Sequence, residues 1–374
     1  MKKQLEIPIL SFFTGGGFLD IGFEDAGFKV VWSNEVNPDF VRLYASGMTA
    51  WKKSSGDVRG FSIRNSKSIE NVFAPEILKD AFPSGRPDIF GVIGGPPCPD
   101  FSVGGKNKGG SGRHGKLSKT FVERICKLKP TFFVFENVTG LFRTHIHREY
   151  LAGLERKLEK HGYCLDLKII SALELGVPQD RERLIMVGIK KSLVGECKGV
   201  RIKEKQRNWF TWPDPKYKGA KADYTWPDIV NGMPPKKPAG IPDELTVNYC
   251  FDFSKTPGLK NCQDVFKAYS DKFYKIKEGD TGRKSFKRLH RYRFSPTVCY
   301  GHNEVHLHPW EPRRLSVREA MRIQGVPDEY ALPEDDSLTA KFAMISNGVP
   351  VPLAREVAKS LMAFLKRGVE NGRS

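Results

Sequence analysis

The strongest constraint on the fold of this chain is an apolar run that ends in two glycines, two prolines and a cysteine. Residues 89–93 predict a buried strand, and Gly94-Gly95-Pro96-Pro97-Cys98 follows it directly. Glycine lets a ligand approach the backbone closely, and proline fixes φ, so this turn holds the cysteine rigidly. In open α/β sheets the carboxyl ends of the strands carry the chemistry. The sequence therefore predicts a reactive thiol at that edge of a sheet.

A basic, glycine-rich segment, residues 103–116, comes after this cysteine. A rigid thiol beside a flexible cationic segment indicates a covalent nucleophile under a closing lid. The alternative is a buried structural cysteine beside a surface loop, which is the usual environment of a free cysteine.

The start of the chain has the pattern of a nucleotide-binding α/β unit. Residues 7–13 predict a strand, which runs through a glycine turn into a helix that ends near Ala26. The next predicted strand ends in Glu35, about where a ribose-binding carboxylate is expected. Asp57 lies in a Gly-Asp-Val that either ends a third strand or forms an ordinary turn, and it is suited to accept from an adenine amino group. No Walker lysine follows the turn, which disfavours a P-loop NTPase.

Two further segments carry candidate catalytic groups. Residues 131–138 predict a buried strand that contains Glu136, and burial would raise the pKa of this carboxyl and keep it protonated. A glutamate that caps the following turn is the alternative. Arg181 and Arg183, at positions i and i+2, would share one face of an extended segment, where guanidinium groups suit a phosphate or a carbonyl oxygen. Taken alone, such a pair is more often a salt-bridged surface.

The charge distribution indicates a polyanionic partner. The 374-residue chain, long enough for two domains, has a net charge of +18. Between residues 190 and 293 there are 24 Lys or Arg and 12 Asp or Glu, a local net charge of +12. In this region cations alternate with Trp, Tyr and Phe, and prolines interrupt any regular pattern of strands and helices. Such a mixture favours a nucleic-acid surface over an ordinary solvated basic face.

Composition excludes several classes of protein. No apolar run is long enough to span a membrane, and no signal peptide precedes the first strand. Seven cysteines without a C-x-x-C pair indicate free thiols in a reducing compartment. His302, His306 and His308 lack a nearby cysteine pair, so we expect no metal site. Near the end of the chain, Ser316 and Glu319 predict a capping box, and residues 352–367 predict an amphipathic helix.

Taken in order, these segments resemble the cytosine-5 DNA methyltransferase family over nearly the whole chain. The resemblance implies a mixed, mostly parallel Rossmann-like α/β sheet with helices on both faces, and a smaller irregular target-recognition domain. It implies a catalytic domain of residues 1–189 and 344–374, a recognition domain of 190–312 and a hinge of 313–343. The matching segments are the cofactor loop at 13–17, Glu35, Asp57, the nucleophile turn at 94–98, the glutamate segment at 136–138, the arginine segment at 179–183, the helix within 314–328 and the closing segment at 347–350.

The resemblance also implies a mechanism and its residues. The Cys98 thiolate would add to carbon-6 of a flipped-out cytosine while protonated Glu136 donates to N3. Arg183 would hold the carbonyl O2, and Arg181 would support the loop or a phosphate. S-adenosylmethionine would supply the methyl group and become S-adenosylhomocysteine. The implied cofactor contacts are Phe13, Gly15, Gly17, Glu35, Asp57, Val58, Pro97, Leu117, Asn347 and Val349, and the implied DNA contacts are Ser102, Gln179 and Arg314.

Three positions depart from the family pattern. Pro99 replaces the usual glutamine, Phe18 replaces a glycine of the cofactor loop, and Ser346-Asn347-Gly348 replaces Gly-Asn-Ala. We expect a monomeric, cytoplasmic bacterial enzyme whose partner is duplex DNA and which does not bind a membrane. It would serve restriction–modification, with an endonuclease that acts on the same sequence, or solitary modification. The alternatives are an RNA cytosine-5 methyltransferase, a non-catalytic DNA-binding homologue and a nicotinamide-dependent oxidoreductase.

Overall fold

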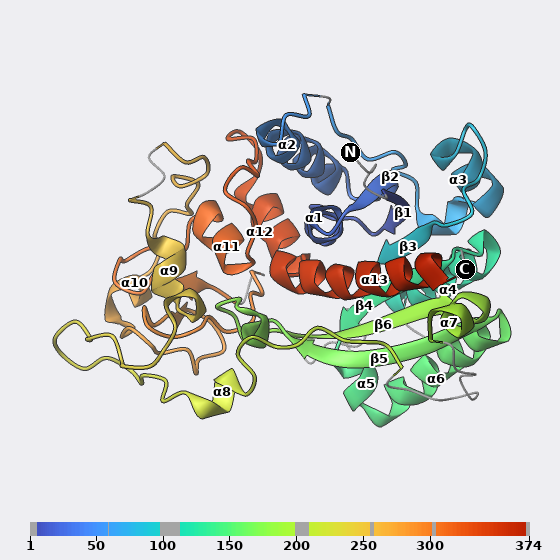
Figure 1. Ribbon diagram of the computed structural model, residues 1–374. Helices are drawn as coiled ribbons and strands as arrows, with labels where there is room; N and C mark the ends of the chain where they lie inside the picture. Colours follow the sequence, from blue (N-terminus) through green and yellow to red (C-terminus); the bar gives the residue numbers. More distant parts are fainter. Residues whose placement is uncertain are drawn as a thin grey trace.

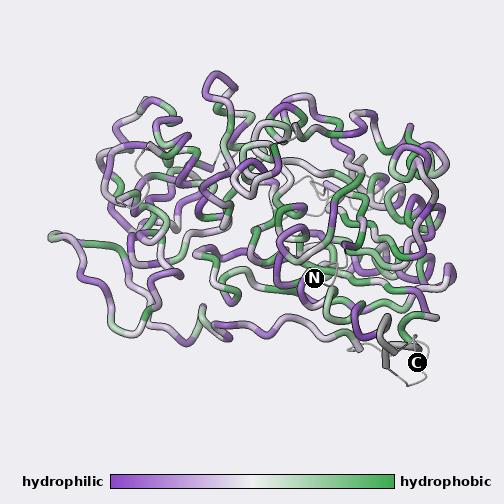
Figure 2. Tube along the Cα trace, turned by 45° about the horizontal axis from the view of Figure 1, so that its top comes forward, coloured by the Kyte–Doolittle hydropathy of each residue, from purple (hydrophilic) through white to green (hydrophobic). Residues whose placement is uncertain are grey.

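The computed structural model describes residues 6–58, 60–97, 113–198, 209–254, 258–300 and 304–371. These residues form two lobes, one built around a sheet and one composed mainly of loops and short helices (Figure 1). Figure 2 shows apolar segments running through the interior of the sheet lobe, whereas the outer helices and loops are largely hydrophilic. The described residues contain no helix that is both long and apolar enough to cross a bilayer.

The sheet has six strands in the order β2-β1-β3-β4-β6-β5. Strands β2, β1, β3 and β4 are parallel, while β6 is antiparallel to both of its neighbours. The predicted mixed, mostly parallel sheet is therefore confirmed. The bounds are β1 (Ile7–Phe12), β2 (Phe28–Asn34), β3 (Gly91–Gly94), β4 (Phe132–Val138), β5 (Tyr163–Ser171) and β6 (Glu182–Lys190).

Helices cover both faces of the sheet, which explains why its strands are apolar almost throughout. Ile93 and Val134 face a core shared with α1 (Phe18–Asp25), α7 (Lys191–Lys198) and α13 (Val351–Asn371). Val92 and Phe133 alternate to the opposite face. The helices there are α3 (Ala74–Ala81), α4 (Arg113–Leu128), α5 (Gly140–Arg143) and α6 (His145–Lys160).

Three further helices pack beside α1 around a third apolar core. They are α2 (Pro38–Ser54), α11 (Val317–Ile323) and α12 (Leu338–Asn347). Side chains cap each of them: Asn37 caps α2, Ser337 caps α12, and Ser316 with Glu319 forms the predicted capping box of α11.

The second lobe comprises the described residues between 213 and 312 and has little regular structure. Its core is held by Arg288, which is buried and donates to the backbone carbonyls of Phe273, Ile276, His308 and Glu311. Its elements are α8 (Ala220–Asp223), η4 (Asp243–Leu245), α9 (Val247–Phe251), α10 (Lys272–Lys275), β7 (Lys287–Arg288) and β8 (His306–Leu307); η1 (Ile69–Asn71) and η3 (Leu173–Leu175) belong to the sheet lobe.

The structure corrects several sequence-based expectations. No strand ends at Gly56-Asp57-Val58, because α2 continues to Ser54 and Gly56 then turns the chain with a φ of 88°. Residues 113–116, expected in a lid, form the first turn of α4. Val194, Trp209 and Phe210, which follow the boundary expected at residue 190, share the core of the sheet with α13. Trp212 also packs against this core, and the second lobe follows it.

Candidate active site

Glu136 and Arg183 meet where β4 and β6 run side by side. Arg183 Nε lies 2.9 Å from Glu136 Oε1, and both side chains are largely shielded from solvent. Burial raises the pKa of Glu136, while the positive charges of Arg183 and Arg181 oppose that rise. The protonated form of Glu136 is therefore more favoured in this site than it would be in water.

The turn that follows β3 lies directly against this carboxyl. A Cβ built on Gly95 would come within 2.4 Å of Glu136 Oε2, so only glycine leaves room for the carboxyl there. Pro96 is buried and Pro97 is exposed. The turn leads on to Cys98, which lies outside the described residues together with Ser102 and most of the expected lid.

Arg181 lies just before β6 and joins three parts of the molecule. Its guanidinium is buried and donates to the carbonyls of Ser346 and Gly348, at 2.9 Å each, and of Val298 at 3.3 Å. Ser346 lies in the last turn of α12 and Gly348 directly follows that helix, whereas Val298 belongs to the second lobe. Arg181 therefore holds the catalytic strand, the closing segment and the second lobe in one arrangement.

A glycine turn and an acidic side chain meet at the carboxyl ends of β1 and β2. Glu35 accepts a hydrogen bond from Gly15 N at 2.9 Å and another from Asn37 N at 2.8 Å. Phe13, Gly15 and Gly17 all have positive φ, so the chain turns sharply here. A Cβ on Gly15 would meet no described atom within 4 Å, so open space adjoins the turn.

The remaining expected cofactor contacts are more dispersed. Asp57 and Val58 follow α2, and the Val58 side chain is exposed. Leu117 is partly buried on α4, and Asn347 is exposed at the last residue of α12, while Val349 is buried.

The comparisons with known proteins identify the family of this chain. Residues 7–363 match the family model described as C-5 cytosine-specific DNA methylase. The chain belongs to this family. It is accordingly a DNA (cytosine-5)-methyltransferase, and membership implies dependence on S-adenosylmethionine and DNA as the substrate.

Similar proteins span the full length of this methyltransferase. The type II methyltransferase M.NmeDI of Neisseria meningitidis serogroup C is 43% identical over 99% of this chain and 86% of its own length. The type II methyltransferase M.MthTI of Methanothermobacter thermautotrophicus is 29% identical over 98% of this chain and 100% of its own.

Solved structures share the fold at lower identity. A putative DNA modification methyltransferase encoded within an E. coli prophage has a TM-score of 0.67 at 23% identity, over 96% of this chain and 100% of that one. The Dnmt2 methyltransferase of S. pombe has a TM-score of 0.60 at 14% identity, over 96% and 99%.

Gln179, expected to contact DNA, is instead fully buried in the methyltransferase. Its amide donates to Ile323 O and Gln324 Oε1, and its oxygen accepts from Val298 N. Without exposed surface the side chain cannot reach DNA in this conformation. Its contacts fasten the segment before β6 to α11 and to the second lobe.

Two residues that the sequence analysis missed support the cofactor loop. Tyr330, after α11, donates to Gly16 O at 2.8 Å in a fully buried contact. Asp20, in the first turn of α1, is buried and accepts from Ser11 Oγ at 2.6 Å. Burial raises the pKa of Asp20 to about 7. An acidic residue among the apolar residues of the first turn of α1 was the available signal for Asp20; no local signal existed for Tyr330.

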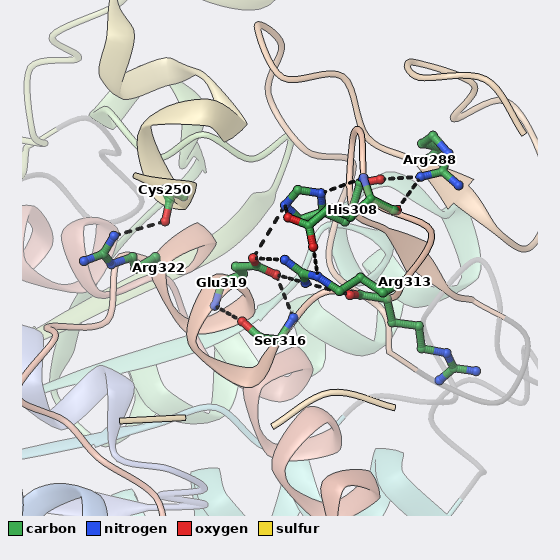
Figure 3. Close-up of polar contacts among 9 residues, drawn as sticks. Cys250, Arg288, His308, Arg313, Ser316, Glu319 and Arg322 are labelled. Carbon is green, nitrogen blue, oxygen red and sulfur yellow. Dashed lines mark hydrogen bonds and ion pairs between the residues drawn. The ribbon is translucent and has the colours of Figure 1, made fainter. Parts of the chain in front are cut away.

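A polar cluster fastens α11 to the second lobe of the methyltransferase (Figure 3). Glu319 accepts from Ser316 N and from both terminal nitrogens of Arg313, and His308 Nε2 lies 3.6 Å from it. Burial lowers the pKa of His308 to about 3, so this histidine is a neutral neighbour of Glu319 and not an ion-pair partner. Among the described residues no group of His, Cys, Asp and Glu is arranged to hold a metal ion.

Arg314, the remaining expected DNA contact, lies at the edge of this cluster. Its guanidinium stacks over the rings of Phe266 and Tyr269, and it donates to Tyr269 Oη at 2.9 Å. Both Arg314 and Tyr269 are accessible to solvent.

Proposed function

We propose that this methyltransferase works through a covalent bond between Cys98 and a cytosine turned out of duplex DNA. The observation that carries the proposal is the position of Glu136, which pairs with Arg183 and lies against Gly95, three residues before Cys98. A cytosine within a base pair is inaccessible to such a group, so the base must leave the stack.

The chain's own residues would divide the chemistry of the ring between them. The Cys98 thiolate adds to carbon-6, and protonated Glu136 donates to N3, so that the negative charge formed in the ring is neutralised. Arg183 turns from Glu136 towards the carbonyl O2 of the base. Once carbon-5 has been alkylated and has released its proton to solvent, elimination of the Cys98 thiolate and return of the N3 proton to Glu136 restore the aromatic ring and the free enzyme.

The residues at the ends of β1 and β2 fit S-adenosylmethionine. Gly15 borders open space, and each oxygen of Glu35 retains accepting capacity for ribose hydroxyls, because a carboxylate accepts about four hydrogen bonds in total. When bound, this cofactor supplies an electrophilic methyl group. Phe13, Gly17, Asp57, Val58, Pro97, Leu117, Asn347 and Val349 complete the proposed binding set.

We further propose that the enzyme is the modification component of a type II restriction–modification system. The support is its likeness to M.NmeDI and M.MthTI, which are type II methyltransferases. The second lobe, with its excess of cations and its exposed Tyr249, Tyr269, Tyr274 and Trp310, would read the target sequence. A single chain contains all the proposed groups, so we propose a monomer that acts in the bacterial cytoplasm.

Methyl transfer from labelled S-adenosylmethionine tests this proposal. Wild-type protein should label duplex DNA at carbon-5 of cytosine and leave RNA unlabelled, whereas Cys98→Ala should not label DNA. A duplex that carries 5-fluorocytosine at the methylated position should trap the wild-type protein in a complex that survives denaturation. Normal methyl transfer by the Cys98→Ala protein would overturn the covalent mechanism.

The same preparations separate the roles of the two neighbouring groups. Glu136→Gln cannot donate a removable proton, so its kcat should fall by about 10²–10⁴. Binding of DNA and of S-adenosylhomocysteine should be unchanged, because the substitution keeps the size of the side chain. A kcat within a factor of about two of wild type would exclude Glu136 as the acid.

A further inference from the structure

A cavity of about 440 Å³ lies between α12 and the second lobe. Its size is within the range of small-molecule sites in proteins. The cavity lies outside the site assembled around Glu136, and nothing in the proposed mechanism uses it. Its walls include Phe266, Tyr269, Tyr300, His306, Arg314 and Phe342.

The aromatic walls contact one another and form one continuous surface on which a flat ring can stack. Phe266 and Phe342 stack with ring centres 5.5 Å apart, and Tyr300 meets Phe342 edge to face at 5.1 Å. The guanidinium of Arg314 lies 4.7 Å from the centre of the Phe266 ring and forms a further flat, cationic surface. Aromatic and guanidinium planes are the surfaces on which proteins stack nucleobases.

The polar atoms of the same walls lack partners. Tyr300 Oη, Arg314 Nε and both ring nitrogens of His306 make no hydrogen bond with any other described residue. His306 is 2% exposed, so no bulk solvent compensates for these missing bonds. Burial lowers the pKa of His306 to about 3, which makes the ring neutral, with one donor and one acceptor nitrogen. The two nitrogens point in different directions, so one of them at a time can pair with a donor or an acceptor on the edge of a nucleobase.

The cavity also adjoins the catalytic groups. Arg181 donates to Val298 O, two residues before Tyr300, and to Ser346 O, in the last turn of the helix that forms the opposite wall. A base of the substrate DNA that bound in the cavity would therefore lie close to the reacting cytosine. Glu304, another wall residue, pairs with Lys287 Nζ at 3.3 Å.

We propose that this cavity binds one nucleobase other than the target cytosine, stacked on the aromatic walls and hydrogen-bonded to His306 and Tyr300. Reaching these atoms requires a small rotation of the Tyr300 or His306 ring, since both are covered in the unliganded protein. The base comes either from a second nucleotide extruded from the duplex or from a free nucleoside. The proposal goes beyond methyl transfer and depends only on DNA being the substrate.

The test blocks the cavity and measures base binding from each source. Thr339 is an exposed wall residue on α12, so Thr339→Trp should fill the space. Ala363→Trp, on the exposed face of α13, is the matched control because it adds the same ring outside the cavity. Ala343→Phe, at another wall residue on α12, is the second test variant if thermal denaturation shows that Thr339→Trp does not fold.

The nucleoside experiment uses protein saturated with S-adenosylhomocysteine, so that adenosine cannot occupy the cofactor site. Deoxyadenosine, deoxyguanosine and thymidine are titrated separately by calorimetry. In the DNA experiment, 2-aminopurine replaces one base at a time in a duplex that the wild-type protein methylates, and its fluorescence rises where a base leaves the stack. Methyl transfer by the same wild-type preparation tests the proposed function independently.

The occupant is a free nucleoside if the wild-type protein binds one and Thr339→Trp weakens that binding about tenfold or more. A loss of this size corresponds to one stacking contact. A 2-aminopurine signal away from the target cytosine, lost in Thr339→Trp and retained in Ala363→Trp, supports an extruded base. If the wild-type protein methylates DNA but neither experiment gives a signal that the cavity variants change, then the cavity does not bind a base. The proposed function would stand in that case.

Discussion

The ring of Phe18 fills the space that a side chain at position 348 would need. A Cβ built on Gly348 would lie 2.2 Å from Phe18 Cδ2, far inside van der Waals contact. These are two of the positions at which the sequence departs from its family, where glycine is usual at the first and alanine at the second. The large residue on α1 and the small residue after α12 therefore compensate each other.

A double-mutant cycle should reveal this compensation. Gly348→Ala alone should lower the free energy of unfolding by about 1–3 kcal/mol, the usual cost of overpacking. Phe18→Gly alone should cost about 3–5 kcal/mol, because it removes a buried ring. In the Phe18→Gly background the cost of Gly348→Ala should disappear, since the ring it meets is gone. Urea denaturation of the four proteins measures the coupling, and equal costs in both backgrounds would show that the two positions are independent.

The contact between Gly95 and Glu136 gives a catalytic prediction. Gly95→Ala would bring a methyl group within 2.4 Å of Glu136 Oε2, so the carboxyl or the nucleophile turn must shift. A displacement of about 1 Å in a reacting group costs on the order of 10² in rate, and we expect that loss in kcat. Affinity for S-adenosylhomocysteine should change little.

Gly60→Ala provides the control for this substitution. It makes the same chemical change where a Cβ would meet no described atom within 4 Å. Single-turnover methyl transfer should distinguish the two variants, and a Gly95→Ala enzyme as fast as Gly60→Ala would show that Glu136 tolerates the shift.

Local patterns in the sequence predicted much of the fold. The strands that became β1, β2 and β4 and the capping box of α11 depend on neighbouring residues, and each lies within a few residues of its predicted place. The false strand at Asp57 arose because Gly-Asp-Val is compatible with either a strand end or a turn. In the structure α2, which packs against α12, continues to Ser54, so this segment is a turn after the helix.

Long-range contacts were beyond the reach of sequence reasoning. Glu136 was expected in a buried strand and Arg183 in an extended segment, but their direct pairing depends on β6 running antiparallel beside β4. Tyr330 and Gly16 are 314 positions apart, and no local pattern links them. Gln179 appeared to be a surface residue because its partners, Val298 and Gln324, are equally remote.

The two neighbouring arginines should respond differently to the same substitution. Arg181→Lys loses the forked guanidinium that reaches three carbonyls. Because buried carbonyls are then left without a donor, the free energy of unfolding should fall by about 2–4 kcal/mol. Arg183→Lys leaves these bonds intact, so its stability should fall by less than about 1 kcal/mol while kcat falls. Thermal unfolding and methyl transfer on the same samples measure both effects. Greater destabilisation by Arg183→Lys would contradict the role assigned to Arg181.

Asp20 should make the stability of the protein depend on pH. Burial raises its pKa from 3.8 to about 7, so the folded protein retains a proton that the unfolded chain has already released over that interval. The stabilising contribution of the neutral carboxyl is therefore complete below about pH 4 and is lost as the pH rises through about 7. At 1.36 kcal/mol per pKa unit, the loss amounts to at most about 4 kcal/mol. Asp20→Asn cannot ionise, and its amide oxygen can still accept from Ser11.

The difference in unfolding free energy between Asp20→Asn and the wild-type protein isolates this titration, because all other groups are common to both proteins. It should shift in favour of the asparagine variant as the pH rises from about 5 to about 8. Urea denaturation at a series of pH values measures the difference. A difference that stays constant over this range would mean that Asp20 is ionised throughout, and that Ser11 and Tyr44, whose hydroxyls lie against its carboxyl, stabilise its charge more than burial opposes it.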